Sequence, residues 1–514
     1  MAGIKDYPRV AMDFSPEVPA LKRVKDKTTI DVRYSVISPF AFIHIYWDPK
    51  IYEVVYSIEE PILDQTEVYF REQILTAMRD MIDFDTIVEK DLDSLLNYID
   101  QRFKMIAFEL GINMSYETYK KIYYYLVRDF VGFNEIDPLL KDYFVEDIEC
   151  NGANHPVYIV HRVFRNLKTS LVFTDMERLE NFVEKLSQRS GKHISYASPI
   201  LDGTLPDGSR VNATYTPDIT SRGPTFTIRK FTKTPWTPPQ LIAFRTLSPE
   251  MLAYLWILVQ YKMNLLITGG TSSGKTTLLN AIAFFIPPEA RVVSIEDTRE
   301  LNLPRENWLP SVSRGAIGAG GIGEVDLFTL LRASFRQNPD YVIVGEVRGK
   351  EAYVLFQGMA SGHSSISTMH ADSVDTVIKR LETPPIELSP TLLNVLDCVC
   401  IMTHAIVDKH ETRKLREIVE IINVTSDGVA LTNTPFTWNA KEDQFYFKKN
   451  SKIFGKISER FGITTKELQE EFRKRAQLIY KMYEAKIFDF QQFQDYVTQY
   501  YKKPGEVLQK FGVR

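Results

Sequence analysis

The sequence has 514 residues, of which 44% are apolar, and its 62 basic and 66 acidic side chains give a formal net charge of −4. A chain of this length is expected to form two or three domains, and its apolar content is sufficient for packed cores. The balanced charge argues against the basic surface that nucleic-acid-binding proteins usually carry, so we expect no nucleic-acid partner. Three cysteines, Cys150, Cys398 and Cys400, form no C-x-x-C pair and favour a reducing, cytoplasmic setting.

No stretch of the sequence predicts a membrane-spanning helix or a signal peptide. The most apolar segment, residues 251–259, is about half as long as the ~20 residues that a spanning helix needs. The first residues lack the apolar centre of a signal peptide. Membrane association is therefore expected to be peripheral, through a partner or the protein surface.

The first half of the chain predicts an arm followed by a two-part domain. Residues 1–28 combine prolines with mixed charges and are expected to be a mobile N-terminal arm, either a solvated tail or a docking segment. Residues 29–231 are expected to form an N-terminal domain that begins with strands. Apolar residues recur every three or four positions in 67–82, 92–110 and 115–130, which predicts a helical subdomain over about 65–130. An α/β unit is expected over about 133–231.

Residues 232–240 predict a stiff linker, because four of the residues 234–239 are Pro or Trp and the segment has little freedom to bend. Beyond it, residues 241–514 are expected to form a C-terminal α/β domain. Candidate strands at 265–268, 291–296, 341–345 and 364–369 alternate with helical patterns, which favours a mostly parallel sheet. A helical appendage is expected over about 440–514, where Thr464 and Glu467 form a capping box.

A glycine-rich loop follows the apolar residues 265–267 and has the pattern of a phosphate-binding P-loop. Its backbone N–H groups can face phosphates, Lys275 adds a positive charge, and Thr276 can ligate Mg²⁺. The helix that begins near Lys275 directs its positive dipole end at the same anion. The expected nucleotide-binding residues are Gly270, Thr271, Ser272, Ser273, Gly274, Lys275, Thr276 and Thr277. The sequence thus predicts a site for a nucleoside triphosphate with Mg²⁺.

Two carboxylates stand at the ends of apolar strands and are candidates for hydrolysis. Glu346 follows the run 341–344 and Glu296 follows 291–295. Parallel strands deliver their last residues to the ligand crevice. Glu346 is therefore expected near Mg²⁺ and Glu296 near the attacking water, where Arg299 or Glu300 can help to hold it; either glutamate can take the role of activating water.

Two further segments near these carboxylates have less specific patterns. Residues 315–323 hold five glycines and predict a flexible loop. His363 and His370 lack the spacing of a metal pair, so phosphate sensing or a subunit contact is favoured for them.

These motifs together resemble a known family. The P-loop and the segments 295–301, 344–348 and 362–371 resemble, in order, the Walker A, Asp, atypical Walker B and His boxes of the type II/type IV secretion ATPase superfamily. Residues 145–152 and 205–210 are similar to its N-terminal signatures, so the resemblance covers about 140–420. Segment 221–231 and the glycines near Gly320 are most similar to the archaellum motor ATPase.

The resemblance implies the fold and the working assembly. It implies a RecA-like P-loop ATPase domain preceded by a helical plus α/β N-terminal domain, acting as a homo-hexamer that hydrolyses ATP with Mg²⁺. It implies that Arg210 and Arg229 stabilise charge during hydrolysis. Lys275, Glu296, Glu346 and His370 complete the expected catalytic set. It also implies a polytopic membrane platform protein and other archaellum motor components as partners, at the inner face of the cell membrane.

Several alternatives stay open. A type IV pilus or secretion assembly ATPase and a DNA-transfer ATPase belong to the same superfamily, although this chain lacks the tetracysteine module frequent in bacterial pilus and type II secretion members. A small GTPase is disfavoured because no guanine-reading Asn/Thr-Lys-x-Asp element is present. A scaffold that binds ATP without turnover is a non-enzymatic alternative. Arg413 and Arg416 are expected to pair with Glu417 rather than to serve the site.

Overall fold

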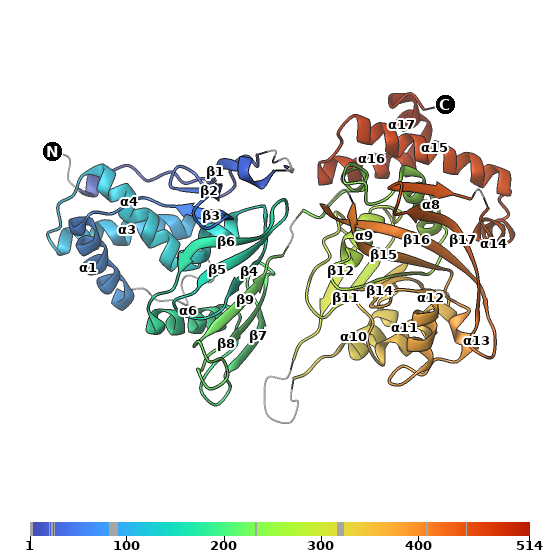
Figure 1. Ribbon diagram of the computed structural model, residues 1–514, viewed down its shortest axis with the longest axis horizontal. Coiled ribbons are helices and arrows are strands. Elements are labelled where there is room, and N and C mark those ends of the chain that lie inside the picture. The colour runs from blue at the N-terminus through green and yellow to red at the C-terminus, as the bar shows by residue number, and fades with distance from the viewer. Residues whose placement is uncertain are drawn as a thin grey trace. The chain divides into compact units, whose positions relative to one another are not determined.

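The computed structural model describes residues 4–513 apart from 20, 22–23, 25, 82–90, 232–233, 316–322, 408–409 and 449. The chain forms two compact units, Met1–Phe231 and Thr232–Arg514 (Figure 1). Each unit has a nine-stranded sheet among its described residues. The predicted flexible loop at 315–323 lies almost wholly outside the described residues, as do the first two residues of the predicted linker.

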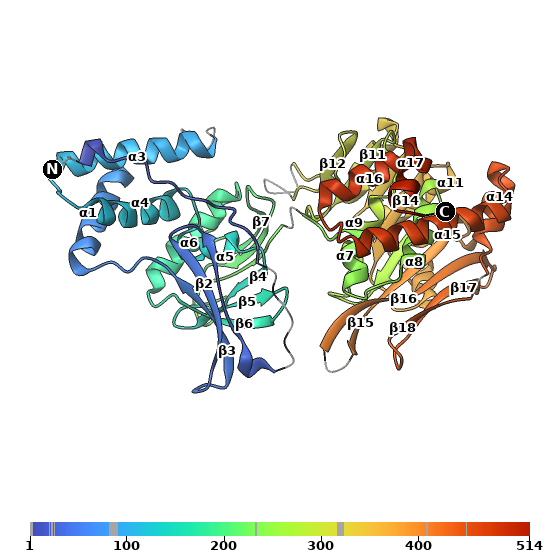
Figure 2. The same cartoon turned by 90° about the horizontal axis from the view of Figure 1, so that it is seen from above.

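The first unit is built on a largely antiparallel sheet. Its strands are β1 (Asp31–Ile37), β2 (Ala41–Asp48), β3 (Glu53–Glu59), β4 (Val145–Cys150), β5 (Pro156–His161), β6 (Arg165–Val172), β7 (Ile200–Thr204), β8 (Arg210–Thr214) and β9 (Thr225–Arg229). Their order is β1-β2-β3-β6-β5-β4-β9-β8-β7, and β3 pairs with β6 in parallel. The early hairpins of β1–β3 thus extend the sheet of the α/β unit rather than forming one of their own (Figure 2).

Three helices form the helical part of this unit: α1 (Gln65–Met81), α3 (Leu92–Glu109) and α4 (Tyr116–Phe130). Asp91 and Ser115 cap α3 and α4 by accepting hydrogen bonds from backbone N–H groups of the first turn. Phe103 and Tyr119 stack with ring centroids 4.5 Å apart, joining α3 to α4. Two shorter elements, α5 (Asp137–Lys141) and α6 (Met176–Arg189), complete the unit.

The N-terminal segment differs from the mobile arm that the sequence predicted. Ile4 and Val10 are buried in the core of the first unit. The Tyr7 hydroxyl donates to Met114 O at 2.7 Å, and the Tyr7 carbonyl accepts from Lys104 Nζ at 2.8 Å. Residues 4 to 10 therefore pack against the helical part of the unit, whereas Asp13 pairs with Ser38 between β1 and β2. This packing could not be predicted from the sequence, because the apolar residues of the segment are scattered among prolines and charged residues. Residues 1–3, 20, 22–23 and 25 of the predicted arm lie outside the described residues.

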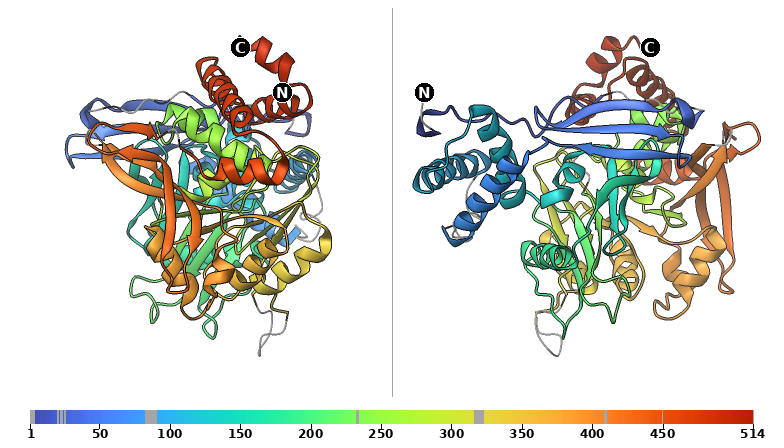
Figure 3. Two further views of the ribbon diagram at one scale, coloured as in Figure 1. Left: turned by 90° about the vertical axis from the view of Figure 1, so that its right-hand side faces the viewer. Right: turned by 60° about the vertical axis from the view of Figure 1, so that its left-hand side comes forward.

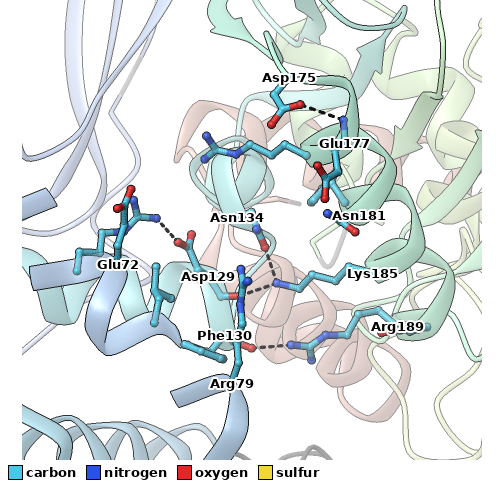
Figure 4. A pocket seen from close by; sticks show the side chains of 15 residues that line it. Glu72, Arg79, Asp129, Phe130, Asn134, Asp175, Glu177, Asn181, Lys185 and Arg189 are labelled. Atoms are coloured by element: carbon cyan, nitrogen blue, oxygen red, sulfur yellow. Dashed lines mark hydrogen bonds and ion pairs between the residues drawn. The ribbon is translucent and has the colours of Figure 1, made fainter. Parts of the chain in front are cut away.

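A polar cleft of about 860 Å³ separates α1 and α4 from α6 (Figure 4). Two of its cations bind backbone carbonyls: Lys185 Nζ donates to Asp129 O at 2.7 Å and to Gly132 O at 3.0 Å, and Arg189 donates to Phe130 O at 2.8 Å. Burial lowers the pKa of Lys185 to about 8. These side chains bind the carbonyls at the end of α4, where a helix favours positive charge.

The second unit contains the mostly parallel sheet that the sequence predicted. Its strands are β10 (Leu265–Gly269), β11 (Val292–Glu296), β12 (Trp308–Val312), β13 (Tyr341–Val344), β14 (Ser364–Met369), β15 (Cys398–Val407), β16 (His410–Val424), β17 (Ala430–Asn439) and β18 (Gln444–Phe447). Their order is β12-β11-β13-β14-β10-β15-β16-β17-β18. The strands from β12 to β15 run parallel, and β15 to β18 are antiparallel. Every residue of β10, β11, β13 and β14 is buried, as expected for parallel strands covered on both faces.

Helices cover both faces of this sheet. They are α7 (Pro238–Ala243), α8 (Pro249–Gln260), α9 (Lys275–Ala283), α10 (Leu327–Ser334), α11 (Glu351–Ala360), α12 (Val374–Glu382), α13 (Pro390–Leu393), α14 (Ile453–Phe461), α15 (Thr465–Glu484), α16 (Phe490–Lys502) and α17 (Pro504–Lys510). Leu265 and Ile267 of β10 belong to one apolar core, and Leu266 to the other. This is the alternation that a strand imposes on its side chains.

The C-terminal segment differs from the helical appendage expected over about 440–514. Residues Gln444–Phe447 form β18 at the edge of the sheet, and the helices begin only at Ile453. The helices also belong to the core, because Trp256 of α8 donates to the Tyr501 hydroxyl at 3.0 Å and Trp256 stacks on Phe285. Figure 3 shows these helices, in red, gathered on one side of the unit, toward the top of both views.

A buried carboxylate connects the antiparallel strands to the C-terminal helices. Glu420 of β16 is fully buried. It accepts hydrogen bonds from the Tyr254 hydroxyl at 2.5 Å, from Asn433 Nδ2 at 2.6 Å and from the Lys452 backbone N–H at 2.8 Å. The Ser451 hydroxyl donates to it at 2.5 Å. One side chain thus satisfies groups from α8, β17 and the start of α14.

We predict that Glu420→Ala destabilises the second unit by about 3 kcal/mol, because it leaves several buried donors without an acceptor. Thermal unfolding followed by circular dichroism measures the effect as a lower Tm. Glu459→Ala, on the exposed side of α14, is the matched control and is expected to unfold like the parent. Equal Tm values for the two variants would contradict the role given to Glu420.

Candidate nucleotide site

The P-loop joins the end of β10 to the start of α9, and its backbone requires glycine at two positions. Gly269 has a φ of +151°, and a Cβ there would lie 2.5 Å from Met402 O. Gly274 has a φ of +94° at the residue before α9. A side chain at either position would be strained, because L-residues rarely adopt these conformations. The loop therefore passes close to β15 before it turns into the helix.

Lys275 is the first residue of α9, directly after the loop, and is buried. Its Nζ donates to Gly269 O at 3.1 Å and Gly270 O at 2.9 Å. It also lies 3.3 Å from His370 Nδ1. Burial lowers the pKa of Lys275, although the charge of Glu346 opposes this shift. Two carbonyl oxygens of the loop thus hold the lysine head group against the loop backbone.

Glu346 and His370 extend this group of charges. Glu346 follows β13, and its Oε1 lies 3.1 Å from His370 Nε2, while its Oε2 accepts from Arg348 Nη2 at 2.5 Å. His370 follows β14. Burial and the neighbouring Lys275 lower the pKa of His370, which favours the neutral imidazole. The structure brings together Lys275, His370 and Glu346 in one chain of contacts at the carboxyl ends of three adjacent strands.

Glu296 lies at the end of β11 and is more deeply buried, with 2% of its surface exposed. Its Oε1 accepts from the backbone N–H groups of Glu300 and Leu301, both at 2.9 Å, whereas its Oε2 has no hydrogen-bond partner. Burial raises the pKa of Glu296 to about 7. A Cβ on Gly345 would lie 3.0 Å from Glu296 Cγ, so the glutamate packs against the residue before Glu346. A carboxyl group with this pKa can take up or release a proton near neutral pH.

The residues at the loop suit Mg²⁺ that arrives with a nucleotide. The described residues contain no group of three or more His, Cys, Asp or Glu side chains that could hold a metal ion by themselves. Mg²⁺ commonly uses one or two protein oxygens together with substrate phosphates and water. Thr276, half-buried in the first turn of α9, and Glu346 can supply those oxygens. This donor set fits Mg²⁺ that is bound jointly by the protein and a triphosphate.

The remaining predicted residues are placed as follows. Thr271 and Ser272 are exposed and Ser273 is buried, with its hydroxyl donating to Gly270 O at 2.8 Å. Thr277 follows Thr276 in α9 and is half-buried. His363 does not join the site contacts; its ring packs against Phe335 with centroids 4.9 Å apart.

Arg210 and Arg229 lie in the first unit, directly opposite each other on β8 and β9. Cross-strand partners share one face of a sheet. Arg210 Nη2 lies 3.0 Å from Asp202 Oδ2, and Arg229 Nε lies 3.3 Å from Asp147 Oδ1. About half or more of each arginine side chain is exposed. The two arginines thus form one cationic pair on the sheet surface, each with a carboxylate partner.

One residue of the site was missed by the sequence analysis. Arg413 was expected to pair with Glu417, but its Nε donates to Ser272 O in the P-loop at 2.8 Å. Arg416 Nε does lie 3.6 Å from Glu417 Oε1, and Arg416 Nη2 also donates to Asp372 O at 2.7 Å. The spacing of charges along the chain could not predict the contact between Arg413 and Ser272. The contact arises because β16 runs antiparallel beside β15 and brings Arg413 to a loop about 140 residues earlier in the sequence.

Comparison with known proteins identifies the family. Residues 134–425, more than half of the chain, match the family model described as type II/IV secretion system protein. The chain belongs to this family. An uncharacterized protein of Methanocaldococcus jannaschii, MJ0900, is 34% identical over 98% of this chain and 95% of its own length. A putative conjugal transfer protein of Mycobacterium tuberculosis, Rv3659c, is 28% identical over 53% of this chain and 79% of its own length.

Among solved structures, the VirB11 ATPase of the Brucella suis type IV secretion system is 25% identical. The structural match covers 55% of this chain and 94% of the VirB11 chain, with a TM-score of 0.29. No helix in the described part of the chain is both long enough and apolar enough to cross a membrane.

The raised pKa of Glu296 predicts how its substitution changes stability with pH. The folded state holds the proton more tightly than the unfolded chain, whose glutamate pKa is about 4.3. The contribution of this proton to the stability of the folded state is therefore complete below about pH 4 and is lost as the pH rises through about 7. Glu296→Gln keeps the Oε1 acceptor and removes the titration. We predict that the free energy of unfolding of this variant, relative to that of the parent, increases by about 2 kcal/mol as the pH is raised from 5 to 8.

Thermal unfolding of the nucleotide-free protein at the two pH values checks this prediction. Glu470→Gln, an exposed position on α15, is the control and should follow the parent at both. A Tm difference between Glu296→Gln and the parent that is the same at pH 5 and pH 8 would show that Glu296 does not hold its proton as described.

Proposed function

We propose that this protein is a Mg²⁺-dependent ATPase whose second unit binds and hydrolyses ATP to perform mechanical work. The observation that carries the proposal is the contact chain from Lys275 through His370 to Glu346 at the P-loop. It joins a phosphate-binding cation to a strand-end carboxylate within one site. Binding alone would require the P-loop but would not require a buried carboxyl group such as Glu296 beside it.

The roles proposed for the residues follow from their positions. The loop from Gly270 to Gly274 would offer backbone N–H groups to the phosphates, with Lys275 as the charge. Thr276 and Glu346 would hold Mg²⁺, which when bound neutralises charge on the phosphate oxygens. Glu296, with a pKa raised to about 7, would accept a proton from the attacking water.

His370, favoured in its neutral form, would report the state of the phosphate site to Glu346. Its two ring nitrogens lie toward Lys275 and toward Glu346, so it contacts both sides of the proposed chemistry.

Arg210 and Arg229 are proposed to stabilise the charge that develops during hydrolysis. Their exposure and their common face make them available to a nucleotide, provided that they exchange their carboxylate partners for phosphate oxygens. This role requires a closed arrangement of domains or subunits. We therefore propose the homo-hexameric ring that the family resemblance implies.

The proposed output is assembly or rotation of the archaellum filament. It rests on the similarity of segment 221–231 and of the glycines near Gly320 to the archaellum motor ATPase. The proposed partners are a polytopic membrane platform protein and other archaellum motor components, reached by peripheral association with the cytoplasmic face of the membrane. Segment Thr225–Arg229 is β9, which carries Arg229, so part of this signature also belongs to the proposed charge-stabilising pair.

Two related functions are the alternatives. A type IV pilus or secretion assembly ATPase would use the same chemistry. DNA transfer is favoured by the likeness to a putative conjugal transfer protein over about half of the chain. Stimulation of ATP hydrolysis by DNA would support that second function, whereas a rate that rises with hexamer formation and ignores DNA would support the filament motor.

We predict that Glu346→Gln retains ATP binding but lowers kcat by about a hundred-fold or more, because it removes a charged oxygen from the reacting centre. Lys275→Ala is expected to lose ATP binding itself. Steady-state phosphate release measures turnover, and titration with a fluorescent ATP analogue measures affinity.

Glu470→Gln provides the control and should match the parent in both assays. Turnover by Glu346→Gln at the parent rate would remove Glu346 from the proposed site. A parent protein that binds ATP without releasing phosphate at any protein concentration would favour the scaffold alternative.

A further inference from the structure

Strand β16 carries two arginines that reach two different loops at the proposed site. Arg413 donates from Nε to Ser272 O in the P-loop at 2.8 Å. Arg416 donates from Nη2 to Asp372 O at 2.7 Å, two residues after His370. The two loops also meet directly, because Lys275 Nζ lies 3.3 Å from His370 Nδ1. Strand β16 thus binds both loops whose residues meet in the contact between Lys275 and His370.

The P-loop conformation needs such support at Ser272. This residue has a φ of +55°, in the left-handed region that costs a residue with a side chain about 1 kcal/mol or more. Its carbonyl is the group that accepts from Arg413. The arginine stem also packs on the loop, because a Cβ on Gly274 would lie 3.4 Å from Arg413 Cδ. Arg413 therefore contacts the loop on both sides of Ser273.

A bulge in β16 allows both arginines to reach the site. Ile401 of β15 faces Glu417 and Met402 faces Leu415, so Arg416 is an extra residue in the ladder. In a regular strand, residues three positions apart point to opposite faces. An extra residue changes this alternation and redirects the side chain.

We propose that Arg413 and Arg416 are positioning residues for the nucleotide, acting through the P-loop and through the loop that carries His370. Arg413 keeps the P-loop in the conformation that receives phosphate, and Arg416 keeps His370 between Lys275 and Glu346. The effect on nucleotide affinity rests on the proposed function, whereas the support of the loop does not. Affinity falls in proportion to the fraction of molecules in the competent conformation, so weaker support appears as weaker binding.

The experiment compares Arg413→Ala and Arg413→Lys with the parent and with Arg473→Ala, an exposed arginine on α15. We expect Arg413→Ala to raise KM for ATP about ten-fold while kcat changes less, since a charged hydrogen bond to the loop is lost. Arg413→Lys, which can still donate to Ser272 O, should recover most of the affinity. Arg416→Ala should instead lower kcat more than it raises KM.

Hydrogen exchange of the nucleotide-free protein separates this proposal from the proposed function. Amides in residues 270–277 should exchange faster in Arg413→Ala than in the parent, with no change in Arg473→Ala. If the parent does not act on ATP but this difference is present, the ATPase proposal fails and the support of the loop stands.

Unchanged exchange and unchanged KM in Arg413→Ala would overturn the inference. It would also be overturned if Arg413→Ala and Arg413→Lys lost affinity equally with the same fall in Tm, because the arginine would then serve general stability only.

Discussion

The parallel pairing of β10 between β14 and β15 is the constraint on which the candidate site depends. It places the P-loop beside the end of β14, where His370 follows, and beside Met402 of β15. The close passage of Gly269 by the Met402 carbonyl is possible only without a side chain. Because β13 pairs with β14 on the other side, Glu346 arrives at the same edge. The site is thus assembled by strand order rather than by long side chains that reach across a cavity.

The candidate site residues of the two units differ in how their charges are surrounded. In the second unit, burial changes the ionisation of the site groups: the pKa of Glu296 rises to about 7, and those of Lys275 and His370 fall. Arg210 and Arg229 in the first unit are instead solvent-exposed and paired with carboxylates. Glu296, the group proposed to accept a proton, therefore lies where water is scarce, and the two arginines proposed to act by charge lie where pairing can change at little cost.

The sequence predicted the local parts of this structure well and the long-range parts less well. The P-loop, the buried strands and the strand-end carboxylates were found because each has its own short pattern, and the parallel sheet followed from their alternation. The packing of Ile4 and Val10, the strand β18 and the contact of Arg413 with Ser272 were not found. Each of these depends on a partner that is distant in sequence. Neither residue periodicity nor charge spacing reports such a partner.

Strand β16 links two distant parts of the second unit. Arg413, at the P-loop, and Glu420, in the buried network with α8 and α14, are seven residues apart on this one strand. An extended strand covers about 23 Å over that interval. The bulge at Arg416 lies within this interval, so the ladder of β16 is interrupted between the two residues while its main chain runs on from one to the other. One strand therefore contacts both the P-loop, through Arg413, and the start of the C-terminal helices, through Glu420.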